Sequence, residues 1–177
     1  MGQTDRRSAI DIRVEALGPL IHRWWGTTQT AIDGMPPHVT LLHPWRPSPV
    51  SAGDLADATA AFTGVEPFDL TFSRLARFPD VIYLVPEPDE ALRSLIERAA
   101  AAFPDTPPYE GAFTDVVPHL TVVKVDEGVP LDDLEHEIAS AIVPELPFRV
   151  HVSEICVDEP GVGPETGWFV RARIPLS

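Results

Sequence analysis

The sequence predicts an α+β fold of two similar lobes, each an antiparallel sheet backed by helices, with a central cleft between them. The first observation is a repeat: PPHVTLL at residues 36–42 and VPHLTVV at residues 117–123 share proline, histidine, an aliphatic residue, threonine and two more aliphatic residues. The second observation is that a helical pattern and a pair of strand patterns follow each copy. Because one order of elements occurs twice, we expect a single two-lobed domain over residues 1–177.

The first half opens with a strand, a helix and the first copy of the repeat. Aliphatic and polar residues alternate in SAIDIRVEAL, which is the period-two pattern of a half-buried strand. The next segment, LIHRWWGTTQTAI, predicts a helix that ends at Gly34, made irregular by Gly26 and the threonines. HVTLLHPW then predicts a strand, because prolines bound its apolar residues.

A capped helix and a hairpin complete this half. Ser51 is the expected N-cap of a helix that Gly64 ends, and Asp54 lies in the first turn, where the helix dipole favours an acid. After it, FDLTFSRLARF and VIYLVP form two alternating strand-like runs that join near Pro79-Asp80. A short break separates them, so we expect a β-hairpin.

The second half follows the same order. Its elements are a helix over PDEALRSLIERAAAAF, a proline-rich loop over PDTPPYEGAFTDVVP, a strand over HLTVVKV, a helix over LDDLEHEIASAIVPEL, and closing strands over FRVHVSEICVDE and GWFVRARIPLS. The apolar residues of both helices recur at the spacing of one helix face. We expect the two closing strands to pair across the turn DEPGVGPETG.

The composition indicates a globular protein with an acidic surface. The chain has 13 Lys and Arg against 27 Asp and Glu, a formal net charge of −14, so we expect no non-specific binding of long nucleic acids. Cys156 is the single cysteine, which excludes an intrachain disulfide and favours a cytoplasmic location. No signal peptide or membrane span is evident. We expect a monomer with a small substrate.

The repeated residues suit acid–base chemistry. Residues i and i+2 of a strand share a face, so His38 and Thr40 point one way, and His119 and Thr121 do the same in the second copy. Two imidazoles can serve as acid and base near neutral pH, and two hydroxyls can stabilise developing negative charge. A phosphodiester fits such a site.

The paired sequences HVTL at 38–41 and HLTV at 119–122 resemble the His-x-Thr-x signature of the two-histidine phosphoesterase superfamily. Within it, the chain is most similar to the 2′-5′ RNA ligase-like and cyclic phosphodiesterase branch. The resemblance implies that the histidines are acid and base and that the threonines hold phosphate. It also implies hydrolysis of 2′,3′-cyclic phosphates or 2′-5′ linkages without metal or cofactor. Which histidine is the base stays open, and no residue specifies ligation over hydrolysis.

Other residues are weaker candidates for the substrate side of the site. Phe78 and Tyr109 could stack on a base. Lys124 and His43 stand five positions beyond the motif histidines, but strict alternation would turn both away from the cleft, so contact requires a bulge or a twist at the strand end.

Two alternatives remain. The six histidines make a metal site conceivable, although none of the usual ligand spacings occurs. The cleft could also belong to a non-catalytic module that binds a nucleotide or a phosphorylated metabolite. Intact histidines in both copies favour the enzyme, because a binding module needs hydrogen-bond donors but no acid–base pair.

Overall fold

The structure is a computed structural model that describes residues 6–24, 35–161 and 167–177. Eight strands and several helices follow one another along these ranges. They are β1 (Ala9–Arg13), η1 (Glu15–Leu17), α1 (Gly18–Ile21), η2 (His22–Trp24), β2 (His38–Leu42), α2 (Ala52–Ala61), β3 (Phe68–Arg77), β4 (Val81–Glu87), α3 (Glu90–Ala102), η3 (Pro108–Gly111), β5 (Leu120–Lys124), α4 (Asp132–Ile142), η4 (Val143–Glu145), β6 (Phe148–Val152), β7 (Glu154–Pro160) and β8 (Trp168–Pro175), where η marks a 3₁₀ helix.

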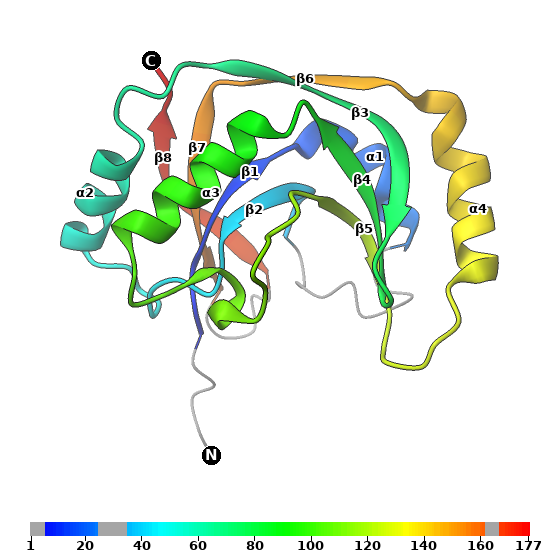
Figure 1. Ribbon diagram of the computed structural model, residues 1–177, viewed down its shortest axis with the longest axis horizontal. Coiled ribbons are helices and arrows are strands. Elements are labelled where there is room, and N and C mark those ends of the chain that lie inside the picture. Colours follow the sequence, from blue (N-terminus) through cyan, green and yellow to red (C-terminus); the bar gives the residue numbers. More distant parts are fainter. Residues whose placement is uncertain (1–5, 25–34, 162–166) are drawn as a thin grey trace.

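The strands form one curled antiparallel sheet in the order β6-β3-β4-β5-β2-β1-β7-β8 (Figure 1). The two strands that carry the repeat, β2 and β5, are neighbours at its centre. The α+β class and the antiparallel sheet backed by helices are thus confirmed. The division into two lobes with a cleft between them stays a prediction.

Helices cover the sheet on two sides. Figure 1 shows α2 and α3 on one side and α4 on the other. The predicted cap of α2 is confirmed, because the Ser51 hydroxyl accepts a hydrogen bond from the Asp54 amide at 3.0 Å. Along α3, Leu92, Leu95 and Ile96 are buried, as the apolar face predicts. No described helix is long and apolar enough to cross a bilayer.

One predicted element was wrong, and another is described only in part. The closing segment FRVHVSEICVDE is two strands separated by Ser153. Of these, β6 pairs with β3 at one edge of the sheet, while β7 pairs with β1 and β8 near the other edge. Only the predicted pairing with the last strand holds, and it involves β7 alone. The helix expected to end at Gly34 is seen as short helical turns up to Trp24, and residues 25–34 lie outside the described ranges.

Several buried charged side chains lie on the neighbouring strands β1 and β7. The Arg13 guanidinium donates two hydrogen bonds of 2.8 Å to the Asp158 carboxylate, which is fully buried. Asp11 is also fully buried, and no described N–H group donates to either of its oxygens. Burial, followed by the charge of Asp158 and a hydrogen bond to it, raises the pKa of Asp11 well above its usual value. The neutral, protonated form of Asp11 is therefore favoured over its carboxylate.

Replacing Asp11 with Asn should raise the free energy of unfolding at pH 7.5 by about 1 kcal/mol or more, because the amide keeps the neutral form at every pH. Because the pKa of Asp11 is raised in the folded protein, the wild type loses stability as pH rises above the pKa that Asp11 has in the unfolded chain. The stability gained by Asp11→Asn should therefore vanish near pH 4. Denaturant titration at both pH values measures this, with Asp57→Asn on the exposed face of α2 as control. A gain of equal size at pH 4 would contradict a protonated Asp11.

Candidate active site

The centre of the site is the contact between β2 and β5. Val39 is opposite Leu120 in this antiparallel pair, and both side chains are fully buried in the core. Because strand side chains alternate, the residues on either side of them point to the opposite face of the sheet. The pairing of two aliphatic residues therefore aligns the two motifs.

Continuing the register by one residue places His38 beside Thr121 and Thr40 beside His119. Neighbouring strands are about 4.8 Å apart, and residues i and i+2 about 6.6 Å. The four motif side chains thus stand at the corners of a small quadrilateral, in which each histidine faces the threonine of the other motif. All four predicted catalytic residues are brought together.

A β-bulge follows the first motif. The register of β1 and β2 passes from Asp11 opposite Thr40 to Ile10 opposite Leu42, so Leu41 has no partner. Both leucines are buried. The strand therefore sends two successive side chains into the core, and its alternation is shifted beyond the bulge.

The second motif has the same irregularity at the equivalent position. Tyr83 is opposite Thr121 and Ile82 is opposite Val123, which leaves Val122 as the extra residue. Val122 and Val123 are both fully buried. The two halves thus share a backbone detail as well as a sequence.

Because of the bulges, the residue five positions after each motif histidine points to the same face of the sheet as the motif side chains. His43 and Lys124 therefore lie on this face, which strict alternation had excluded. Lys124 is paired with Asp80, at 3.8 Å between Nζ and Oδ2. His43 packs edge-on against Trp168, with 6.0 Å between ring centroids, and burial lowers its pKa.

Both motif histidines are held by the backbone in the same way. His38 Nδ1 lies 2.8 Å from the carbonyl oxygen of Pro36, and His119 Nδ1 lies 2.8 Å from that of Val117. A carbonyl only accepts, so each Nδ1 carries the hydrogen, and in the neutral ring Nε2 keeps a free lone pair. Each motif thus presents Nε2 as its reactive nitrogen.

Burial sets the charge of both rings. It lowers the pKa of His38 from 6.5 to about 4, although the hydrogen bond to Pro36 acts in the opposite direction. Burial also lowers the pKa of His119, to a smaller extent. At neutral pH the free protein therefore holds two neutral imidazoles, and His119 is the one that protonates more readily.

Aromatic side chains surround His119. The Phe78 ring meets it edge-on with 5.2 Å between centroids, and the Tyr83 ring lies 5.5 Å away. Phe78 also stacks on Tyr83 at 4.4 Å. The candidate Phe78 therefore lies at the site, but the sequence analysis missed Tyr83. Its only signal was that it is the one residue of VIYLVP with a polar group in its side chain.

The candidate Tyr109 lies on the Thr40 side of the site. Its amide donates to the His43 carbonyl at 2.8 Å. Burial raises the pKa of its hydroxyl, and the Thr40 side chain acts in the opposite direction. Its φ of 51° is in the left-handed region, which is strained for a non-glycine residue. The proline-rich loop thus holds a strained residue against a motif threonine.

Known proteins share this architecture. The structure of TT0787 from Thermus thermophilus superposes with a TM-score of 0.65 at 16% identity, covering 96% of this chain and 97% of that one. Escherichia coli LigT in complex with 3′-AMP superposes with a TM-score of 0.62 at 18% identity, covering 97% and 98%. No curated protein matches the sequence.

A sequence model of one family covers most of the chain. It describes the 2′-5′ RNA ligase superfamily and matches residues 14–159, which include both motifs, the bulges that follow them and the loop that holds Tyr109. The fold that surrounds the two motif strands is also that of LigT. The chain therefore belongs to the 2′-5′ RNA ligase superfamily, within the two-histidine phosphoesterases.

Proposed function

We propose that the protein is a metal-independent phosphodiesterase that hydrolyses 2′,3′-cyclic phosphates or 2′-5′ linkages of nucleotides or RNA ends. Membership in the superfamily supports a phosphoesterase-type enzyme. The observation that carries the proposal is the quadrilateral of two histidines and two threonines, with both Nδ1 atoms tied to carbonyls. A module that only binds phosphate has no need for two free Nε2 atoms.

The unequal pKa values suggest a role for each histidine. His38, whose pKa is lowered to about 4, stays neutral at physiological pH and is the base. His119, with the smaller shift, is the acid. Water loses a proton to His38 Nε2 and its oxygen bonds to phosphorus. The bond from phosphorus to the ribose oxygen breaks, and that oxygen takes the proton of His119 Nε2.

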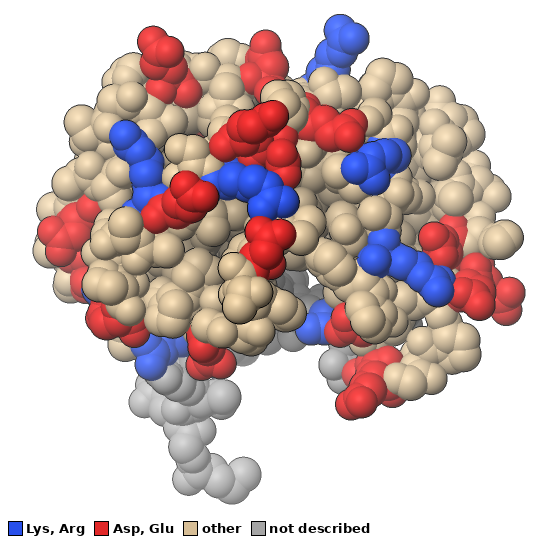
Figure 2. Space-filling model, in the orientation of Figure 1, with Lys and Arg blue, Asp and Glu red and all other residues tan. Residues whose placement is uncertain are grey.

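Thr40 and Thr121 are the proposed donors to the non-bridging oxygens, where charge increases in the transition state. The Tyr109 hydroxyl, whose pKa the Thr40 side chain affects, would orient the first of them. A nucleotide substrate is supported by the LigT structures, since that protein has been solved with 3′-AMP and with NADP+. Figure 2 shows Lys and Arg beside Asp and Glu on the visible face, which favours small substrates over long RNA.

His38→Ala and His119→Ala should each lower kcat for nucleoside 2′,3′-cyclic monophosphates by about 10³-fold in the presence of a chelator, because each removes one proton transfer. The melting temperature should change little. His151→Ala, on the exposed edge strand β6, is the matched control and should be fully active. Unchanged rates in both variants would refute the assignment, and binding without turnover in the wild type would favour the binding module.

The value of kcat/KM should peak below neutral pH. The free enzyme must hold a neutral His38 and a protonated His119. Activity should therefore fall below about pH 4, and it should fall again at higher pH as His119, whose pKa burial lowers, loses its proton. The alkaline limb should move to higher pH in kcat, because a bound phosphate anion stabilises the His119 cation. A pH series of both parameters measures this. A kcat/KM that rises from pH 7 to pH 9 would be incompatible with it.

An activated leaving group should separate the two roles. A p-nitrophenyl phosphodiester needs no protonation of its leaving oxygen, so His119→Ala should recover most of the wild-type rate on this substrate. His38→Ala should stay slow on both substrates, because the water still requires a base. The ratio of rates on the two substrates for each variant gives the result. Recovery in His38→Ala instead would reverse the assignment.

A further inference from the structure

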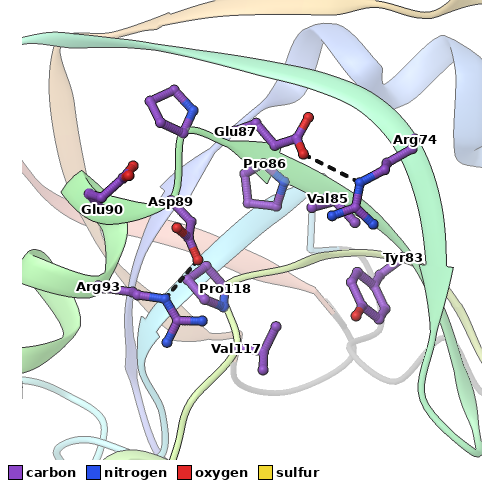
Figure 3. Close-up of a pocket in the computed structure, with 11 residues that line it drawn as sticks. Arg74, Tyr83, Val85, Pro86, Glu87, Asp89, Glu90, Arg93, Val117 and Pro118 are labelled. Carbon is purple, nitrogen blue, oxygen red and sulfur yellow. Dashed lines mark hydrogen bonds and ion pairs between the residues drawn. The ribbon is translucent and has the colours of Figure 1, made fainter.

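A pocket of about 420 Å³ opens on the side of His119. Strand β4 and the start of α3 form its walls, with a contribution from β3 and from the segment before β5 (Figure 3). The residues that line it are Arg74, Tyr83, Val85, Pro86, Glu87, Pro88, Asp89, Glu90, Arg93, Val117 and Pro118. The volume is in the range of pockets that hold ligands of nucleotide size.

Three lining residues join this pocket to the site. Tyr83 packs against the His119 ring, Val117 provides the carbonyl that holds His119 Nδ1, and Pro118 precedes His119 in the chain. Tyr83 and Thr121 are also opposite each other in the sheet. The pocket is therefore the continuation of the face that carries the motifs.

The two halves of the sheet differ at this point. In one half, Tyr83 is opposite Thr121, and Val85 lies two residues further along the strand. In the other half, Asp11 is opposite Thr40, and Arg13 lies two residues further along. Arg13 is therefore the equivalent of Val85. There, the buried ion pair of Arg13 with Asp158 fills the space beside His38. A large substrate group therefore finds room beside His119 but not at the equivalent position beside His38.

The charges of the pocket select an uncharged group. Arg93 pairs with Asp89 and Asp115 at 2.7 Å each, and Arg74 pairs with Glu87 at 3.3 Å. Figure 3 shows the pair with Glu87 at the upper right of the pocket and the pair with Asp89 at its left. Each arginine that lines the pocket is thus neutralised, and a phosphate there would meet a carboxylate excess. Ribose hydroxyls and base amino groups can instead donate to these carboxylates.

We propose that this pocket binds the nucleoside, sugar and base, of a substrate whose phosphate lies between the motif residues. The inference rests on the proposed function, because it takes the phosphate position from the four motif residues. The apolar wall of the pocket, made of valine and proline, covers the base, and the carboxylates of the pocket hold the sugar. A second phosphate is excluded from it.

Binding of 3′-AMP and of inorganic phosphate, measured by calorimetry, tests this without any turnover. Val85→Phe should fill the pocket from the strand side. We expect the wild type to bind 3′-AMP about tenfold or more tightly than phosphate, and the variant to lose that difference while its Kd for phosphate stays the same. Val170→Phe makes the same change at a half-buried strand position outside the pocket, so it should retain the difference.

The proposed nucleoside site is refuted if the Val85→Phe variant keeps the preference for 3′-AMP, or if this variant loses affinity for 3′-AMP and phosphate equally. If Val85→Phe does not fold, Glu90→Trp at the exposed start of α3 gives the same readout, with Ala101→Trp on the same helix as control. Hydrolysis of a cyclic phosphate by the wild type is scored separately. If the protein binds 3′-AMP and phosphate as expected but hydrolyses no cyclic phosphate, the proposed function is wrong and the nucleoside-binding role of the pocket is retained.

Discussion

The pairing of Val39 with Leu120 is the contact on which the rest of the site depends. It is a contact between two fully buried aliphatic side chains, and its specificity comes from burial. A slip of one residue would turn the apolar residues of one strand to the site and its histidine to the core. The hydrophobic core thus sets the register, and the register sets the distance between two groups 81 residues apart in the chain.

The same scaffold carries different side chains in its two halves. Both have a bulge after the motif and a carbonyl that holds Nδ1, so the backbone is nearly symmetric at the site. The neighbours are not: a buried ion pair lies beside His38, while aromatic rings and an open pocket lie beside His119. An acid and a base need different surroundings, and a symmetric pair would have no reason to divide the roles.

The sequence predicted most of the elements, and it predicted that the two repeated motifs lie on strands, because these are local signals. Alternation, caps and prolines identify β2, α2 and α3 without knowledge of their partners. The break at Ser153 was missed, since β6 and β7 differ only in which distant strand they join. The bulges at Leu41 and Val122 were equally invisible, because an extra apolar residue in an apolar strand changes no pattern. Tyr83 was missed because Thr121, its partner across the sheet, lies on a strand distant in the sequence.

An acidic protein that binds an anionic substrate needs a local source of attraction. The cations that the described strands place near the motifs, Arg13 and Lys124, each already pair with a carboxylate. Attraction must therefore come from hydroxyl donors and from a proton taken up by a histidine whose pKa burial has lowered. The histidines of such a site stay neutral until the anion binds. The site without ligand therefore holds no unpaired buried charge, which would be costly. It also disfavours long polyanions, because one proton and a few dipoles cannot balance their charge.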